Sequence, residues 1–108
     1  MLQVEIVARD AAREGIALVQ ALPRGNGELV DQVKRALISV VLNTTEGLNR
    51  TAGDRRNLLT VARGSAAEAG AALGLLVALG LADEARVDTL DTQLDRVRGM
   101  LFRLAQRG

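Results

Sequence analysis

The fold is decided by the stretch Gln32-Val33-Lys34-Arg35-Ala36-Leu37-Ile38-Ser39-Val40-Val41-Leu42-Asn43-Thr44-Thr45-Glu46-Gly47. Its apolar residues recur at steps of three and four, which places them on faces of an α-helix. One row is Val30, Val33, Leu37, Val40 and Thr44, and a second is Ile38, Val41 and Thr45. Because two rows are apolar, we expect more than one face of this helix to be buried.

A polar row runs along the same helix. Its members follow one another at steps of four, four and three residues, which places them on one face. They are Arg35, Ser39, Asn43 and Glu46. A second polar set, Arg63, Ser65 and Glu68, lies in the next helical segment among Ala, Leu and Gly. Polar groups surrounded by apolar surface must satisfy one another, because each one left without a partner costs about 1–3 kcal/mol.

These polar residues admit a catalytic or a structural interpretation. As an active site they offer carboxylates and guanidiniums, but no nucleophile with an adjacent base. As a structural network they would form Arg63–Glu68 or Arg35–Glu68 ion pairs, while Asn43 and Glu46 bond backbone at the next turn. Buried ionic groups can fix the register of packed helices. We favour a structural polar network inside the bundle, made of Arg35, Ser39, Asn43, Glu46, Arg50, Arg63, Ser65 and Glu68.

Three further segments read as helices, over residues 2–22, 52–79 and 84–106. Pro23 with Gly25 and Gly27, and later Gly80, are expected to end helices, and Asp83 to cap the last one. Thr51 and Asp54 have the spacing of an acidic capping box. The last helix has a seam at steps of three and four, consisting of Val87, Leu90, Leu94, Val97, Leu101 and Leu104. Short loops between helices of similar length predict an all-α protein, a single domain over residues 1–108 folded as an antiparallel up-down-up-down four-helix bundle.

Composition excludes several classes of function. The 108 residues include no Cys and no His, which removes thiolate and imidazole chemistry and the usual zinc sites, so we expect no metal and no cofactor. The single aromatic residue, Phe102, indicates no platform for stacking bases. Residues 1–22 do not read as a secretion signal, and the apolar run over residues 69–82 is shorter than the roughly 20 residues of a membrane span. We expect a cytoplasmic protein without a membrane partner.

A stripe of small residues recurs at every fourth position of the third helix, namely Ala66, Gly70, Gly74 and Ala78. Each Gly costs about 1 kcal/mol against Ala in a helix interior, so close packing is the expected compensation. That packing is either within the monomer or at a subunit contact.

Arginines gather at one end of the expected bundle, with Arg50, Arg55, Arg56, Arg98, Arg103 and Arg107. The opposite end collects the acidic residues Glu28, Asp31, Asp83, Glu84 and Asp88. In the last helix the acidic-to-basic order also suits the helix dipole, so the pattern is explained either by dipole matching or by a phosphate-binding rim.

Residues 32–47, followed by Arg50, resemble a signature of small bacterial four-helix-bundle proteins, the 23S rRNA intervening-sequence protein family. Residues 62–68 resemble their second signature. The chain is also similar to the basic, pentameric accessory variability protein of diversity-generating retroelements, which binds nucleic acid and a reverse transcriptase. The resemblance implies a left-handed bundle that forms a homo-oligomer, often a pentamer, and it suggests an RNA-related role. Unlike the basic retroelement proteins, this chain has a net charge of only +1.

Two functional hypotheses follow. The first is a non-enzymatic protein that forms a homo-oligomer, with a pentamer favoured, and acts as an interaction or scaffold module. The alternative is a nucleic-acid-associated accessory protein that binds RNA or DNA phosphates, or a nucleic-acid enzyme, through the arginine-rich end.

Overall fold

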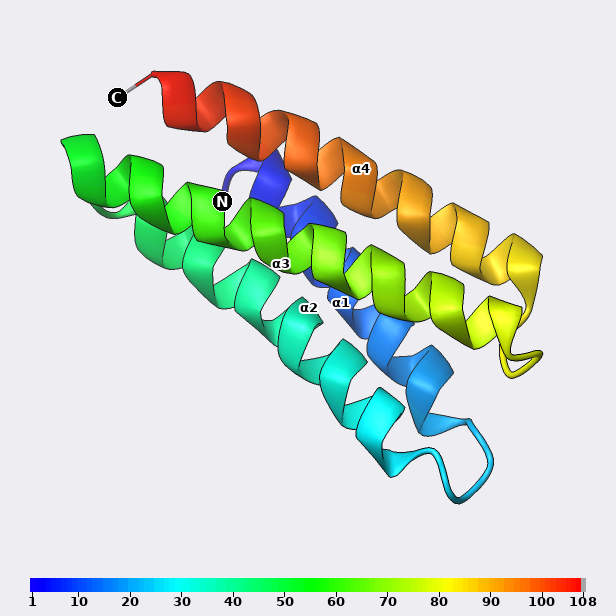
Figure 1. The fold of residues 1–108 in the computed structure, drawn as a ribbon. Coiled ribbons are helices and arrows are strands. Elements are labelled where there is room, and N and C mark those ends of the chain that lie inside the picture. Colours follow the sequence, from blue (N-terminus) through cyan, green and yellow to red (C-terminus); the bar gives the residue numbers. More distant parts are fainter. Residues whose placement is uncertain (108) are drawn as a thin grey trace.

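A computed structural model describes residues 1–107, which form four α-helices and no strand (Figure 1). The helices are α1 (Gln3–Gln20), α2 (Gly27–Leu48), α3 (Ala52–Ala78) and α4 (Glu84–Gln106). Successive helices run in opposite directions, and both α1 and α3 pack against α2 and α4. The predicted all-α, antiparallel up-down-up-down bundle is therefore confirmed. The beginning of α1, the end of α4 and the α2–α3 turn lie at one end of the bundle.

The loop between α1 and α2 is set by its own residues. Gly25 has a φ of +97°, a value that favours glycine. The Asn26 side-chain amide donates a hydrogen bond to the Pro23 carbonyl oxygen at 2.9 Å. These features turn the chain within a few residues, so that α2 returns alongside α1.

The connection between α3 and α4 forms as predicted. Gly80 has a φ of +73°, and its N–H donates to the Val77 carbonyl at 2.9 Å. The Leu81 N–H donates to the Leu76 carbonyl at 2.9 Å, which completes the paired bonds of a Schellman motif. Asp83 then caps α4, because its side chain accepts a hydrogen bond from the backbone N–H of Arg86.

The predicted capping box at the start of α3 is wrong. Thr51 occupies the N-cap position with an extended backbone, but its side chain makes no capping hydrogen bond. The next residue, Ala52, has a φ of +48°, in the left-handed region that L-residues rarely adopt. The sharp turn from α2 to α3 therefore enters the helix at an angle that does not bring the threonine hydroxyl over the free N–H groups of the first turn.

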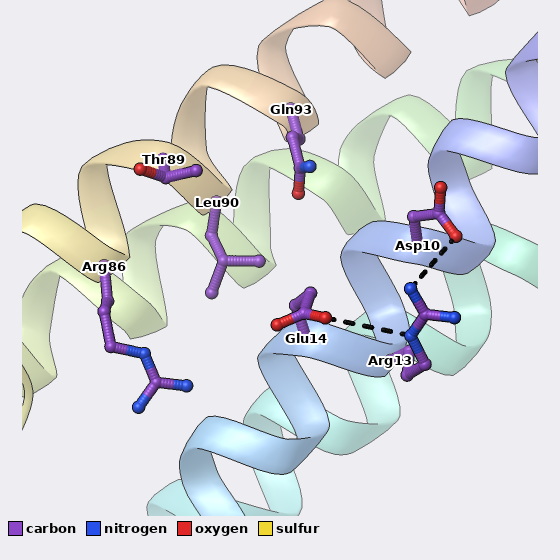
Figure 2. Close-up of a pocket in the computed structure, with 7 residues that line it drawn as sticks. All are labelled: Asp10, Arg13, Glu14, Arg86, Thr89, Leu90 and Gln93. Atoms are coloured by element: carbon purple, nitrogen blue, oxygen red, sulfur yellow. Dashed lines mark ion pairs between the residues drawn. The ribbon is translucent and has the colours of Figure 1, made fainter.

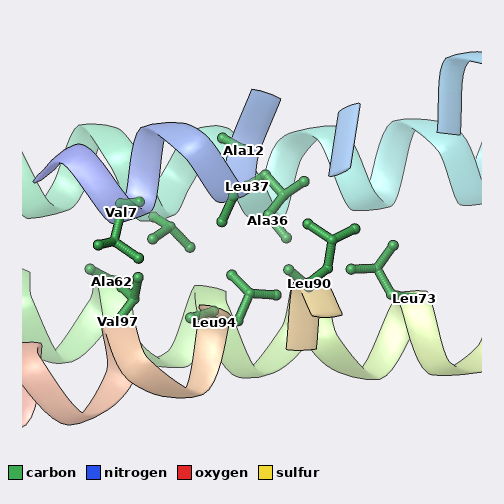
Figure 3. Close-up of a cluster of buried hydrophobic side chains, with 14 of the residues drawn as sticks. Val7, Ala12, Ala36, Leu37, Ala62, Leu73, Leu90, Leu94 and Val97 are labelled. Atoms are coloured by element: carbon green, nitrogen blue, oxygen red, sulfur yellow. The ribbon is translucent and has the colours of Figure 1, made fainter. Parts of the chain in front are cut away.

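The core lies between the α1–α2 pair and the α3–α4 pair (Figure 3). Figure 3 shows Ala36 and Leu37 of α2 facing Leu90 and Leu94 of α4 across this layer. Of the seam predicted for the last helix, the first five residues are buried and Leu104 is half-buried. Many core positions hold alanine, including Ala8, Ala11, Ala36, Ala62, Ala66 and Ala69. Such small residues allow the helix backbones to approach closely.

The second apolar row of α2 is not buried, contrary to the prediction. Ile38 is 44% exposed, Val41 is half-buried and Thr45 is exposed. The reason is geometric: in a four-helix arrangement each helix has two neighbours, and the row through Val33, Leu37 and Val40 already fills the core-facing side. Of the remaining aliphatic side chains of α2, Leu29, Val30, Val41 and Leu48 pack against the edge of the core, whereas Ile38 and Leu42 are exposed.

Within residues 1–107, α3 is the one helix long and apolar enough to cross a membrane by length and composition. However, six of its residues are buried in the core, and it packs along both α2 and α4. Its apolar composition is that of a helix held between two others.

Candidate functional site

The predicted polar residues form a partly buried seam between α2 and α3. The hydroxyls of Ser39 and Ser65 lie 2.7 Å apart, and the Asn43 amide donates to both the hydroxyl and the carbonyl oxygen of Ser39 at 3.0 Å. Further along, the Gln32 amide reaches a carboxylate oxygen of Glu68 at 3.5 Å. Ser39, Asn43 and Ser65 are half-buried, so their mutual bonds satisfy groups that water reaches only in part. We call this hydrogen-bonded row the polar seam.

The charged members of the predicted network do not lie inside the bundle. Arg35, Glu46, Arg50 and Glu68 are all exposed. Glu46, near the end of α2, pairs at 3.2 Å with Arg50 in the following turn rather than bonding backbone. Neither Arg35 nor Arg63 lies within ion-pair distance of Glu68 in residues 1–107.

The spacing explains why the two predicted ion pairs fail. Arg63 and Glu68 are five residues apart, a separation that turns their side chains toward different neighbours of α3. Glu68 lies on the α2 side, whereas Arg63 packs on the aromatic ring of α4. The polar network is thus a seam of mostly neutral side chains, with the exposed carboxylate of Glu68 at its edge and the other charged residues outside it.

Exposed aliphatic side chains lie beside this seam. In α3, Val61 stands four residues before Ser65, and Leu75 stands seven residues after Glu68. Leu79, the C-cap residue, follows Leu75 by four, so all three share the α2-facing outer side. In α2, Leu42 is one turn from Ser39, and Ile38 is one turn from Leu42. We call the surface made by Ile38, Leu42, Val61, Leu75, Leu79 and the polar seam the α2–α3 outer face.

The small-residue stripe of α3 packs within the chain over its first half. Ala66 is buried in the core, and a Cβ placed on Gly70 would lie 2.7 Å from a carboxylate oxygen of Asp91 on α4. Gly74 and Ala78 are exposed, and a Cβ on Gly74 would meet no atom within 4 Å. Gly70 thus leaves room for the Asp91 carboxylate, while a Cβ on Gly74 would have no close neighbour within the described residues.

The arginine-rich end forms where the topology predicts it, around the start of α3 and the end of α4 (Figure 1). Arg50, in the α2–α3 turn, pairs with Glu46 of α2, and Arg98 pairs with Asp95 of its own helix. Arg55 donates to the carbonyl oxygen of Leu48 at 3.5 Å. The other three make no ion pair within residues 1–107, and they are Arg56, Arg103 and Arg107.

The structure also reveals a cation–aromatic contact that the sequence analysis missed. The guanidinium carbon of Arg63 lies 4.8 Å from the centre of the Phe102 ring, and Phe102 is 47% exposed.

Two adjoining hollows between α3 and α4 share Arg63 and Arg98. Together they are lined by Thr60, Arg63, Gly64, Ala67, Asp95, Arg98, Gly99, Phe102 and Arg103. We call this surface the α3–α4 groove. The count of aromatic residues did not indicate that the one present, Phe102, is exposed beside an arginine.

A second pocket, also missed, lies between α1 and α4 (Figure 2). Arg13 reaches Asp10 at 3.5 Å and Glu14 at 3.8 Å on α1, and Arg86 extends from α4 toward the same gap. The buried side-chain oxygen of Gln93 has no hydrogen-bond partner within the described residues. In the sequence, the spacing of Asp10, Arg13 and Glu14 on one helix indicated this group of charges. The carboxylates here already face a guanidinium, so the pocket resembles a surface ion-pair cluster.

The polar groups of these sites are hydroxyls and amides bonded to one another, together with paired and unpaired guanidiniums. No group of three or more acidic side chains in residues 1–107 comes close enough together to hold a metal ion. The hydroxyls of the polar seam bond each other and an amide, not a general base. What the chain presents is an exposed aliphatic face on α2 and α3 and a cationic groove between α3 and α4.

Comparison with known proteins agrees with the fold. A family model described as "23S rRNA-intervening sequence protein" matches residues 1–103. A solved structure from Bacteroides thetaiotaomicron VPI-5482, described as a protein with unknown function from the S23 ribosomal protein family, superposes with a TM-score of 0.85 at 19% sequence identity. The match covers 94% of this chain and 97% of that one. No curated protein sequence matches the chain.

Proposed function

We propose that this chain, which belongs to the 23S rRNA-intervening sequence protein family, is a non-enzymatic interaction module that works as a homo-oligomer. The observation that carries the proposal is the α2–α3 outer face. Its five aliphatic residues leave between 44% and 61% of their surface exposed, and they are Ile38, Leu42, Val61, Leu75 and Leu79. A cytoplasmic location is part of the same proposal.

Burial of this face is favourable on physical grounds. Each Å² of apolar surface removed from water contributes about 25 cal/mol, so several half-exposed leucines supply a substantial part of an association energy. The half-buried polar seam beneath them is already satisfied by its own hydrogen bonds, and so adds little desolvation cost. Exposed aliphatic side chains spaced along one side of a small domain are typical of an interaction surface.

The occupant that we propose for the face is a second copy of the chain. Arg35 and Glu68 border the face with opposite charges and pair with no charged group in residues 1–107. A different surface of a neighbouring copy can therefore supply the missing partner of each. A pentamer is favoured by the resemblance stated above, and a closed ring requires each copy to use two different surfaces.

Leu42→Glu is expected to lower the native mass of the assembly. Leu42 is the most exposed aliphatic residue of the face, at 61%, so a carboxylate there costs little in the monomer but opposes burial at a contact. Light scattering after size-exclusion chromatography measures the mass at matched concentrations. Ala17→Glu adds the same charge at an exposed position of α1 and serves as the control. Equal native masses for Leu42→Glu and the unmodified chain would refute this interface.

The second candidate function is nucleic-acid binding through the arginine-rich end. It is favoured by Arg56, Arg103 and Arg107, whose charges no carboxylate in residues 1–107 neutralises. A ring of copies would repeat this set, and multivalency can offset a modest charge per subunit. The partner would be RNA or DNA, alone or held by a nucleic-acid enzyme.

A salt series tests the second candidate. Because phosphate contacts release counterions, the logarithm of the binding constant should fall linearly with the logarithm of salt concentration. Arg103→Gln is expected to make that slope shallower by about one unit, whereas Arg86→Gln, at the other end of α4, should leave it unchanged. Filter binding with RNA and DNA measures both. Absence of binding at low salt would end this candidate and leave the homo-oligomer proposal intact.

A further inference from the structure

We propose that the α3–α4 groove binds single-stranded nucleic acid by stacking one base against Phe102 and holding the adjacent phosphates with arginines. The proposal rests on the nucleic-acid-binding function proposed above, and it names the site and the form of the ligand. It follows from three features of the groove: an exposed aromatic ring, an excess of positive charge and a lining of small residues.

The aromatic ring is both accessible and held in place. Phe102 keeps 47% of its surface exposed, although the Arg63 guanidinium lies 4.8 Å from the ring centre. The guanidinium is attracted to the electron-rich face of the ring, which restrains both side chains. Aromatic rings and guanidinium planes are the surfaces on which unpaired bases stack, and every base has a face that fits them.

The groove carries more positive than negative charge. Arg63, Arg98 and Arg103 line it together with a single carboxylate, that of Asp95. Arg98 pairs with Asp95 at 3.1 Å, so Arg63 and Arg103 are left without an ion-pair partner in residues 1–107. The Nε atom of Arg63 is buried and has no hydrogen-bond partner within the described residues. Two uncompensated guanidiniums beside an exposed ring suit a ligand that combines phosphate with a planar base.

Small residues give this ligand room. Gly64 and Ala67 of α3 and Gly99 of α4 lie between the arginines. A Cβ placed on Gly64 would meet no atom within 4 Å, and one on Gly99 would lie 3.5 Å from the guanidinium of Arg103. A duplex keeps its bases stacked on one another, whereas a single strand can turn one base into a groove of this kind. An acidic peptide could use the arginines but has no need of the ring.

The experiment uses Phe102→Trp as a probe. The chain has no Trp and no Tyr, so a tryptophan at this position reports on the groove alone. We expect its fluorescence to be quenched saturably by a short single-stranded RNA or by single-stranded DNA of the same sequence, and these two arms identify the preferred sugar. Thr89→Trp, exposed on the same helix, should show no saturable quenching. Inorganic polyphosphate carries the charge without a base, and equal quenching by polyphosphate would overturn the proposal.

Phe102→Leu completes the test without the new fluorophore. The substitution keeps an apolar side chain and removes the stacking surface, so binding of the same RNA at fixed salt should weaken roughly tenfold to a hundredfold. If the unmodified chain binds RNA while Phe102→Leu binds equally well, this site is refuted but the nucleic-acid function stands. If the unmodified chain binds no RNA or DNA at low salt, both fail. Displacement of bound RNA by an acidic peptide that also quenches Phe102→Trp would contradict base stacking.

Discussion

Leu73→Ala is expected to lower the free energy of unfolding by about 2–5 kcal/mol. Leu73 is fully buried in α3 and points into the layer between the two helix pairs (Figure 3). Its truncation removes apolar contacts and leaves a cavity, because the surrounding helices close over the gap only in part. Chemical denaturation followed by circular dichroism measures the loss.

Ile6→Ala is the matched control for this prediction. It removes a similar aliphatic side chain from α1, where Ile6 is 47% exposed, so its effect should be well under half as large. Both variants must be compared at one protomer concentration, because assembly adds to apparent stability. Equal losses for the two variants would contradict the placement of the core.

Gly47→Ala is expected to destabilise the bundle by about 1–3 kcal/mol, even though alanine is the better helix former. A Cβ on Gly47 would lie 2.8 Å from Cδ2 of Leu59 and 3.1 Å from Cβ of Leu58. The tip of Leu59 can rotate, but the Cβ of Leu58 is fixed to the backbone of α3. The substitution must therefore push α2 and α3 apart beside the turn that joins them.

Gly64→Ala provides the contrast on a neighbouring helix. A Cβ at that position of α3 would meet no atom within 4 Å, so the higher helix propensity of alanine should stabilise the protein by up to about 1 kcal/mol. Thermal and chemical unfolding of both variants measure the difference. Stabilisation by Gly47→Ala would show that the α2–α3 contact is looser than described.

The fold could be predicted from the sequence because the residues that end and begin its helices are strong local signals. Pro23 with Gly25, and Gly80 with Asp83, stop and start helices through backbone preferences that hold whatever the helices pack against. The Thr51–Asp54 capping box was wrong because it depends on the angle at which the chain leaves α2. That angle depends on how α2 and α3 pack against each other, and the φ of +48° at Ala52 reflects it.

The candidate sites were less predictable, because periodicity gives the relation between side chains on one helix but not the direction in which a face points. The spacing of Arg35, Ser39, Asn43 and Glu46 correctly places them on one side of α2. Aliphatic residues surround that row, so the sequence alone did not show that the side borders solvent. Likewise, Arg63 and Phe102 are 39 positions apart in the sequence, and only the packing of α3 on α4 brings them to 4.8 Å.

The two sides of α3 carry different residues, and we propose a different partner for each side. Its α2 side carries Val61, Leu75 and Leu79 beside the polar seam, and we propose that a second copy of the chain covers it. Its α4 side carries Arg63 against Phe102, where we propose that nucleic acid binds. The two proposals use separate surfaces, so each can fail without the other.

The central claim is that this family member functions as a homo-oligomer through its α2–α3 outer face. The most direct test is the native mass of the unmodified chain, measured by light scattering over a range of concentrations. The proposal predicts about five times the protomer mass of 11.4 kDa. A mass of about 11.4 kDa at every concentration would contradict it.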